Sequence, residues 1–230
     1  MKENINIGYL LFLAVVAAVG GYLFGYDTAV ISGTISQITN LFHLDKIQEG
    51  WYVGCALIGS IVGVMLAGRL SDCIGRKVTM LISAVLFSMS AIGCAISASF
   101  FDLVIWRMVG GLGIGVISII SPLYISEVSI AKYRGRLVAL YQLAVTIGFL
   151  GAYLVNYLLL DMAQSGTLLG IWWLDGIIAT EVWRAMLGMA MWPAIAFFII
   201  LFSVDSVRQV IVIVTHWKGL LLVIFYLSVF

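Results

Sequence analysis

Long apolar stretches alternate with short polar segments along this chain of 230 residues. A helix needs about 20 consecutive, mostly apolar residues to cross the hydrocarbon core of a bilayer. Six stretches meet that requirement, at residues 7–33, 50–68, 78–98, 103–124, 137–160 and 184–202. The pattern therefore predicts an all-α membrane protein with six transmembrane helices.

The composition agrees with a membrane location. Hydrophobic residues make up 63% of the chain and charged residues only 10%, whereas soluble domains have about half and about a quarter. The first apolar stretch is too long for a cleaved signal peptide and leads directly into another membrane segment, so we expect an uncleaved first span. The net charge of +1, with no basic run, gives no indication of a nucleic-acid partner.

The placement of basic residues predicts the orientation. The segments after the second and fourth apolar stretches carry six of the twelve Lys and Arg residues, namely Arg69, Arg76, Lys77, Lys132, Arg134 and Arg136. Because basic loops stay in the cytoplasm, the N-terminus is predicted to be cytoplasmic as well.

The first and fourth stretches share a glycine-rich pattern. GYLFGYDTAVISG in the first loosely resembles GGLGIGVISIIS in the fourth. This similarity fits an inverted repeat of three plus three helices. A chance likeness between two apolar, glycine-rich segments explains it equally well.

Two opposite charges stand out inside the apolar stretches. Counting about 1.5 Å per residue places Asp27 and Arg107 both in the outer half of the bilayer. Pairing lowers the cost of burying each, and charges at this depth usually mark functional sites. The affinity of the carboxylate for a proton then depends on how near the arginine lies, which is the chemistry of a proton-coupled carrier. The alternative is a static ion pair that joins two helices.

The segment GRLSDCIGRK, residues 68–77, is the second motif. Gly68 and Gly75 are expected to form a tight turn between antiparallel helices. Asp72, Arg76 and Lys77 would then be placed to reach a helix end or the acidic Glu127. A solvated basic loop that follows the positive-inside rule is the simpler alternative.

These motifs resemble a known family. GRLSDCIGRK is similar to the loop between the second and third helices of the major facilitator superfamily. The run from residue 109, then RGRLVALYQLA and VWRAML, resemble its sugar-porter branch, most closely the bacterial proton-linked xylose symporters. The residues at that branch's spacing in the run are Gly111, Gly115, Tyr124, Glu127 and Arg134.

The resemblance implies roles for individual residues. Asp27 would take up the proton, with Arg107 as its partner. Asp72, Arg76, Glu127 and Arg134 would form a cytoplasmic charge network, to which Gly68, Gly75 and Lys77 belong by position.

The resemblance also implies a substrate site. Gln142 matches the first of two glutamines that bind sugar hydroxyls in the family, and Phe149 stands where the second is expected. An unpaired sugar hydroxyl costs roughly 1–3 kcal/mol in a closed site. Phe149 could instead stack on the face of a sugar, so the resemblance does not identify the sugar.

The resemblance implies that residues 1–203 form the N-terminal half of a major facilitator fold. The predicted function is proton-coupled transport of a pentose or hexose sugar by alternating access in the bacterial inner membrane, alone as a homodimer or with a second half. The alternative is a truncated, non-transporting remnant or a six-span membrane partner protein. Residues 204–230 form an apolar tail without the two prolines that the family has there. A frame-shifted gene or a short additional membrane segment would each explain the tail.

Other chemistries have little support. The three cysteines, Cys55, Cys73 and Cys94, are scattered, so neither a metal site nor a disulfide framework is predicted. GGLGIG follows no strand, which argues against a dinucleotide-binding loop. We therefore expect no enzymatic activity and no cofactor.

Overall fold

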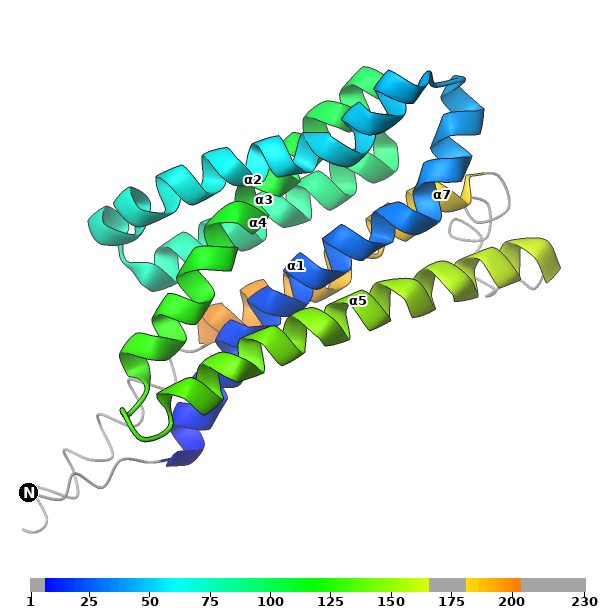
Figure 1. Ribbon diagram of the computed structural model, residues 1–230. Coiled ribbons are helices and arrows are strands. Elements are labelled where there is room, and N and C mark those ends of the chain that lie inside the picture. The colour runs from blue at the N-terminus through cyan, green and yellow to red at the C-terminus, as the bar shows by residue number, and fades with distance from the viewer. Residues whose placement is uncertain (1–6, 166–180, 204–230) are drawn as a thin grey trace, which may run out of the picture.

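A computed structural model describes residues 7–165 and 181–203. These residues form helices without a strand, in the order α1 (Ile7–Phe42), α2 (Lys46–Ile74), α3 (Arg76–Ile96), α4 (Phe100–Val128), α5 (Arg134–Ser165) and α7 (Val182–Gly188) (Figure 1). The last span continues from α7 through a turn at residues 189–190 to residue 203. With this last span counted as Val182–Ser203, the described residues contain six helices long and apolar enough to cross a membrane, as predicted. The tail at 204–230 lies outside the described residues.

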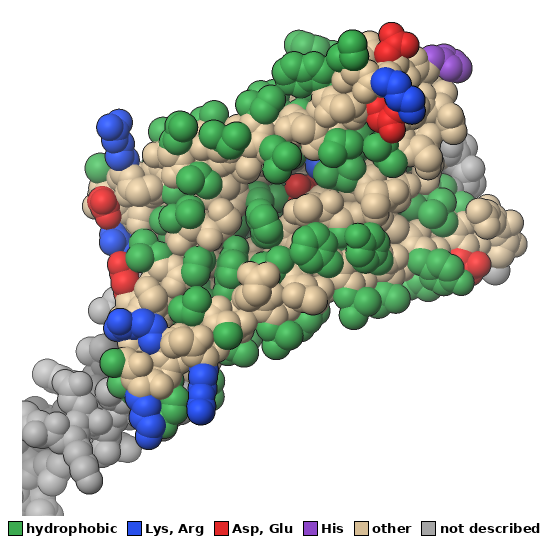
Figure 2. All heavy atoms as spheres, in the orientation of Figure 1, with side chains coloured by type: hydrophobic (Ala, Val, Ile, Leu, Met, Phe, Trp, Pro, Cys, Tyr) green, Lys and Arg blue, Asp and Glu red, His purple; other side chains and the backbone are tan. Residues whose placement is uncertain are grey.

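The short connections place the charged ends of the helices together. The α2–α3 turn and the α4–α5 connection lie at the same end of the bundle as the start of α1 (Figure 1). Most of the Lys and Arg side chains visible on one face gather at this end (Figure 2). We call it the basic end.

Gly75 alone makes the turn between α2 and α3. It ends α2 and precedes α3 with φ at +88° and ψ at 152°, a backbone conformation that residues with a Cβ rarely adopt. Gly68 lies inside α2, because the helix continues to Ile74. The expectation that Gly68 helps to form the turn was therefore wrong.

These two glycines make a matched pair for a stability test. A Cβ at either position would meet nothing within 4 Å, so only the backbone conformation differs between them. We expect Gly75→Ala to lower the free energy of unfolding by about 1–3 kcal/mol. Gly68→Ala should raise it by about 0.5–1 kcal/mol, because alanine favours a helix interior. Thermal unfolding of the two variants in detergent would measure both; equal effects would contradict the role of the turn.

Helices α2 and α4 pack backbone against backbone. A Cβ at Gly59 would collide with the carbonyl oxygen of Met108, and one at Gly111 with the carbonyl oxygen of Ala56. Small residues permit such close approach, which takes the place of a hydrophobic driving force between helices in lipid.

Helices α1 and α5 pack in the same way. A Cβ at Gly25 would collide with the carbonyl oxygen of Val145, and one at Gly148 with the carbonyl oxygen of Tyr22. The first helix of each group of three thus packs on the second helix of the other group, as an inverted three-plus-three repeat predicts.

Candidate functional site

The structure brings Asp27 and Arg107 together. Asp27 lies on α1 and Arg107 on α4, with 3.7 Å between an Oδ2 and an Nη2 atom. The Arg107 side chain is 2% exposed and the Asp27 side chain 18%. The separation exceeds that of a charge-assisted hydrogen bond, which is about 2.7–2.9 Å. The two groups therefore form a loose ion pair inside the bundle, as the prediction that they can pair requires.

Arg107 has few other partners. Its Nε and Nη2 atoms are buried and make no hydrogen bond to the residues that the structure describes. Its guanidinium carbon lies 5.4 Å from the centre of the Tyr52 ring, within the range of a cation–π contact. A cavity of about 10 Å³ lies between the pair, α3 and α7, and is too small for a ligand larger than water.

Asp27 also opens onto a larger cavity of about 400 Å³. The side chains of this cavity come from α1, α2 and α4, and Arg107 is absent from its lining. In Figure 2, an acidic and a basic patch are recessed at mid-length among apolar and uncharged atoms, apart from the charged ends. Asp27 thus borders open space, whereas Arg107 does not line this cavity.

Three hydroxyl groups lie among the mostly apolar side chains that line this cavity. Thr28, Ser32 and Ser60 line it, and each donates its hydroxyl hydrogen to a carbonyl oxygen of its own helix, at 2.7–2.8 Å. Their oxygen lone pairs stay free to accept hydrogen bonds. The cavity therefore offers acceptors to water or to a hydroxylated ligand.

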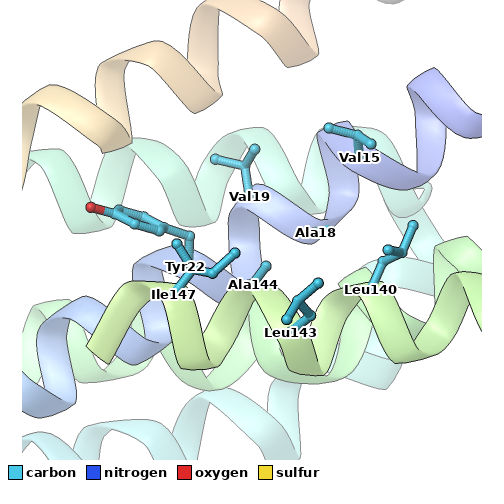
Figure 3. A pocket seen from close by; sticks show the side chains of 8 residues that line it. All are labelled: Val15, Ala18, Val19, Tyr22, Leu140, Leu143, Ala144 and Ile147. Carbon is cyan, nitrogen blue, oxygen red and sulfur yellow. The ribbon is translucent and has the colours of Figure 1, made fainter. Parts of the chain in front are cut away.

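A second groove, of about 280 Å³, runs between α1 and α5. Its lining is almost entirely apolar, and the side chains of both helices border it (Figure 3). They belong to Val15, Ala18, Val19, Tyr22, Leu140, Leu143, Ala144 and Ile147. It holds no charge or amide that would mark it as a polar binding site.

The two predicted sugar-binding residues lie away from the Asp27 cavity. Gln142 is exposed on α5, and Phe149 is half-buried where α5 packs on α1. Neither lines the cavities beside Asp27. Their seven-residue separation places them on one side of α5.

At the basic end, Arg76 joins three helices. Its Nη1 atom lies 3.0 Å from Oδ1 of Asp72 on α2, and its Nη2 atom lies 3.1 Å from Oε1 of Glu127 on α4. Arg134 is exposed at the start of α5 and forms no ion pair within the described part of the chain. Exposed pairs contribute little to stability, typically about 0–1 kcal/mol. The network is thus better suited to positioning helix ends than to holding the bundle together.

Sequence reasoning missed one contact around Arg107. Tyr52 is fully buried, and its hydroxyl lies 2.6 Å from the Thr34 hydroxyl of α1. An uncharged tyrosine in an apolar stretch gives no signal of this role. Only the packing of α2 on α4 brings its ring to the arginine.

The chain matches known proteins along most of its length. A family model described as "Sugar (and other) transporter" matches residues 13–215. The glucose transport protein of Synechocystis sp. is 38% identical over 205 residues, which cover 89% of this chain and 43% of that protein. The D-xylose-proton symporter of Escherichia coli K12 is 36% identical over 232 residues, covering 90% of this chain and 45% of that one. The chain thus spans less than half the length of these relatives.

A solved structure has the same arrangement of helices. The proton:xylose symporter XylE superposes with a TM-score of 0.75 at 36% identity, over 86% of this chain and 45% of that one. A bacterial homologue of the lysosomal transporter Spinster, at 22% identity and a TM-score of 0.67, shares the fold alone.

Proposed function

Because the chain belongs to the sugar transporter family of the major facilitator superfamily, we propose that it is the proton-coupling half of a proton–sugar symporter. The single observation that carries this proposal is the loose ion pair between Asp27 and Arg107 inside the bundle. Ionisable residues inside a membrane bundle are costly, so a buried pair supports a functional role such as proton coupling.

The pair provides a means of coupling. A proton that binds the Asp27 carboxylate forms a neutral carboxylic acid and removes the counter-charge of Arg107, which stays ionised. An unpaired buried charge is expensive, so protonation changes the relative energies of arrangements in which α1 and α4 lie differently. The cavity of about 400 Å³ beside Asp27 gives the proton a way to reach the acid without passing Arg107.

Sugar binding needs groups from more than this bundle. We assign Gln142 and Phe149 to the α5 side of the site, and the hydroxyl oxygens of the Asp27 cavity face the same opening as the acid. A second six-helix bundle, either another copy or a separate half, would supply the opposite wall, because alternating access rocks two bundles about a shared site.

The orientation follows from the basic end. The connections after α2 and α4 lie at the same end of the bundle as the start of α1 (Figure 1). We therefore place this end and the N-terminus in the cytoplasm of a bacterial cell. In that orientation the network of Asp72, Arg76 and Glu127 acts as a cytoplasmic gate.

Uptake of labelled pentoses and hexoses tests the proposal. Cells would express the chain alone, or together with the C-terminal half of the Escherichia coli D-xylose-proton symporter. We expect proton-driven accumulation of a sugar with the second half, and less or none with the chain alone. A folded, membrane-inserted chain that supports no uptake in either setting would favour a non-transporting membrane partner.

A further inference from the structure

The guanidinium of Arg107 contacts two side chains of different kinds. The Asp27 carboxylate lies 3.7 Å from its Nη2 atom, and the centre of the Tyr52 ring lies 5.4 Å from its carbon. Two of its nitrogen atoms make no hydrogen bond to the described residues. The arginine is thus held by a loose ion pair and by an aromatic ring, without a close fork of hydrogen bonds.

No other full charge faces this arginine in the described bundle. The ionisable groups that act on it are Asp27 of α1, Tyr52 and Cys55 of α2, and Cys94 of α3. The residues of the last span that border the neighbouring small cavity, Leu187 and Ala190, are apolar. When Asp27 is neutral, the Tyr52 ring and the Cys55 thiol remain as uncharged partners of the cation. The thiol is only a weak hydrogen-bond acceptor, so the ring is the stronger of the two.

The Tyr52 ring is fixed in place. Its hydroxyl lies 2.6 Å from the Thr34 hydroxyl, and both residues are fully buried. Thr34 follows Asp27 by seven residues on the same side of α1, about 10 Å further along the helix. Helix α1 thus contacts Arg107 in two ways, directly through Asp27 and indirectly through Thr34 and Tyr52.

From these contacts we propose that Tyr52 is a positioning residue that retains Arg107 when Asp27 takes up a proton. The ring attracts the guanidinium through its negative face, and this attraction is stronger away from water. It lowers the cost of a buried arginine that has lost its counter-charge, so that a proton can bind while the bundle stays folded. The inference rests on the proposed proton uptake at Asp27.

A double-mutant cycle on the purified full chain tests this role. Asp27→Asn mimics the protonated acid, and Tyr52→Leu removes the ring. Tyr52→Leu lowers the melting temperature in either background through lost packing. We expect an additional drop of about 2–4 °C in the Asp27→Asn background, where the ring is the main partner of Arg107. Equal drops in both backgrounds would show that Tyr52 only fills space, and would overturn the proposal.

Two conservative variants separate the ring from its hydroxyl. Tyr52→Phe keeps the ring, so its additional drop in melting temperature in the Asp27→Asn background should be much smaller than that of Tyr52→Leu. Thr34→Val, which removes the hydroxyl partner of Tyr52 at similar volume, should behave like Tyr52→Phe. If Tyr52→Phe showed the same additional drop in the Asp27→Asn background as Tyr52→Leu, the effect would belong to the hydroxyl. That result would contradict the ring contact.

Fluorinated phenylalanines at position 52 cover the case in which Tyr52→Leu does not fold. Each added fluorine weakens the negative face of the ring with little change in shape, so the melting temperature in the Asp27→Asn background should fall stepwise. A flat series would overturn the proposal. None of these measurements involves sugar. If they gave the expected results while the uptake experiment failed, the role of Tyr52 at Arg107 would stand and only the proposed transport function would be rejected.

Discussion

Proteoliposomes that contain the Asp27→Asn variant, assembled with a second half, are expected to lose sugar accumulation against a gradient while still equilibrating sugar across the membrane. A membrane potential of 100 mV is worth about 2.3 kcal/mol per charge, which corresponds to about 50-fold accumulation for one proton per sugar. The asparagine side chain cannot exchange a proton, so this ratio should fall to about 1. Labelled sugar and a pH-sensitive dye would measure accumulation and proton entry together.

Asp161→Asn is a matched control, because Asp161 is an exposed acid in the last part of α5. It removes the same charge and should leave accumulation unchanged. Accumulation that persists in Asp27→Asn would exclude Asp27 as the coupling site and leave the ion pair with a structural role.

Gly111→Val is expected to prevent close packing of α4 on α2. The added Cβ would overlap the carbonyl oxygen of Ala56, which is backbone and cannot rotate away. The two helices would have to separate, at a cost of about 3 kcal/mol or more in the free energy of unfolding. Gly111 is one turn beyond Arg107, so separation would also disturb the ion pair. Size-exclusion profiles and thermal unfolding in detergent would measure the loss.

Gly68→Val is the control for this prediction. Gly68 lies in the interior of α2, where a Cβ would meet nothing within 4 Å. The same substitution there should change the free energy of unfolding by less than about 1 kcal/mol. Similar losses at both positions would show that valine harms these helices through its helix propensity and not through the α2–α4 contact.

The sequence located the spans well but ended the first one too early. The predicted span at 7–33 continues as α1 to Phe42, through the more polar residues 34–42. Several side chains in and just before this segment donate hydrogen bonds to their own helix, as Ser32 does to the carbonyl oxygen of Ala29 and Thr34 to that of Ile31. Hydropathy counts such residues as polar, although their hydroxyls are already bonded.

The candidate site was predicted in part. Counting along the helices put Asp27 and Arg107 at one depth, and the structure pairs them. It also joins Asp72 and Glu127 through Arg76, whereas Arg134 lies outside that network. These roles in coupling and gating are still predictions, as are those of Gln142 and Phe149.

The sequence by itself determined which stretches of the described residues form membrane-spanning helices and which charges lie within them. In lipid, backbone groups find hydrogen-bond partners only within a helix, and buried charges are costly. Both the spans and the charges inside them can therefore be read from the type of each residue. Tertiary structure alone decided which side chains meet. A helix that is apolar on every side gives no periodic signal of its rotation. The contact of the Tyr52 ring with Arg107 and the glycine contacts between α2 and α4 therefore depend on how the helices cross.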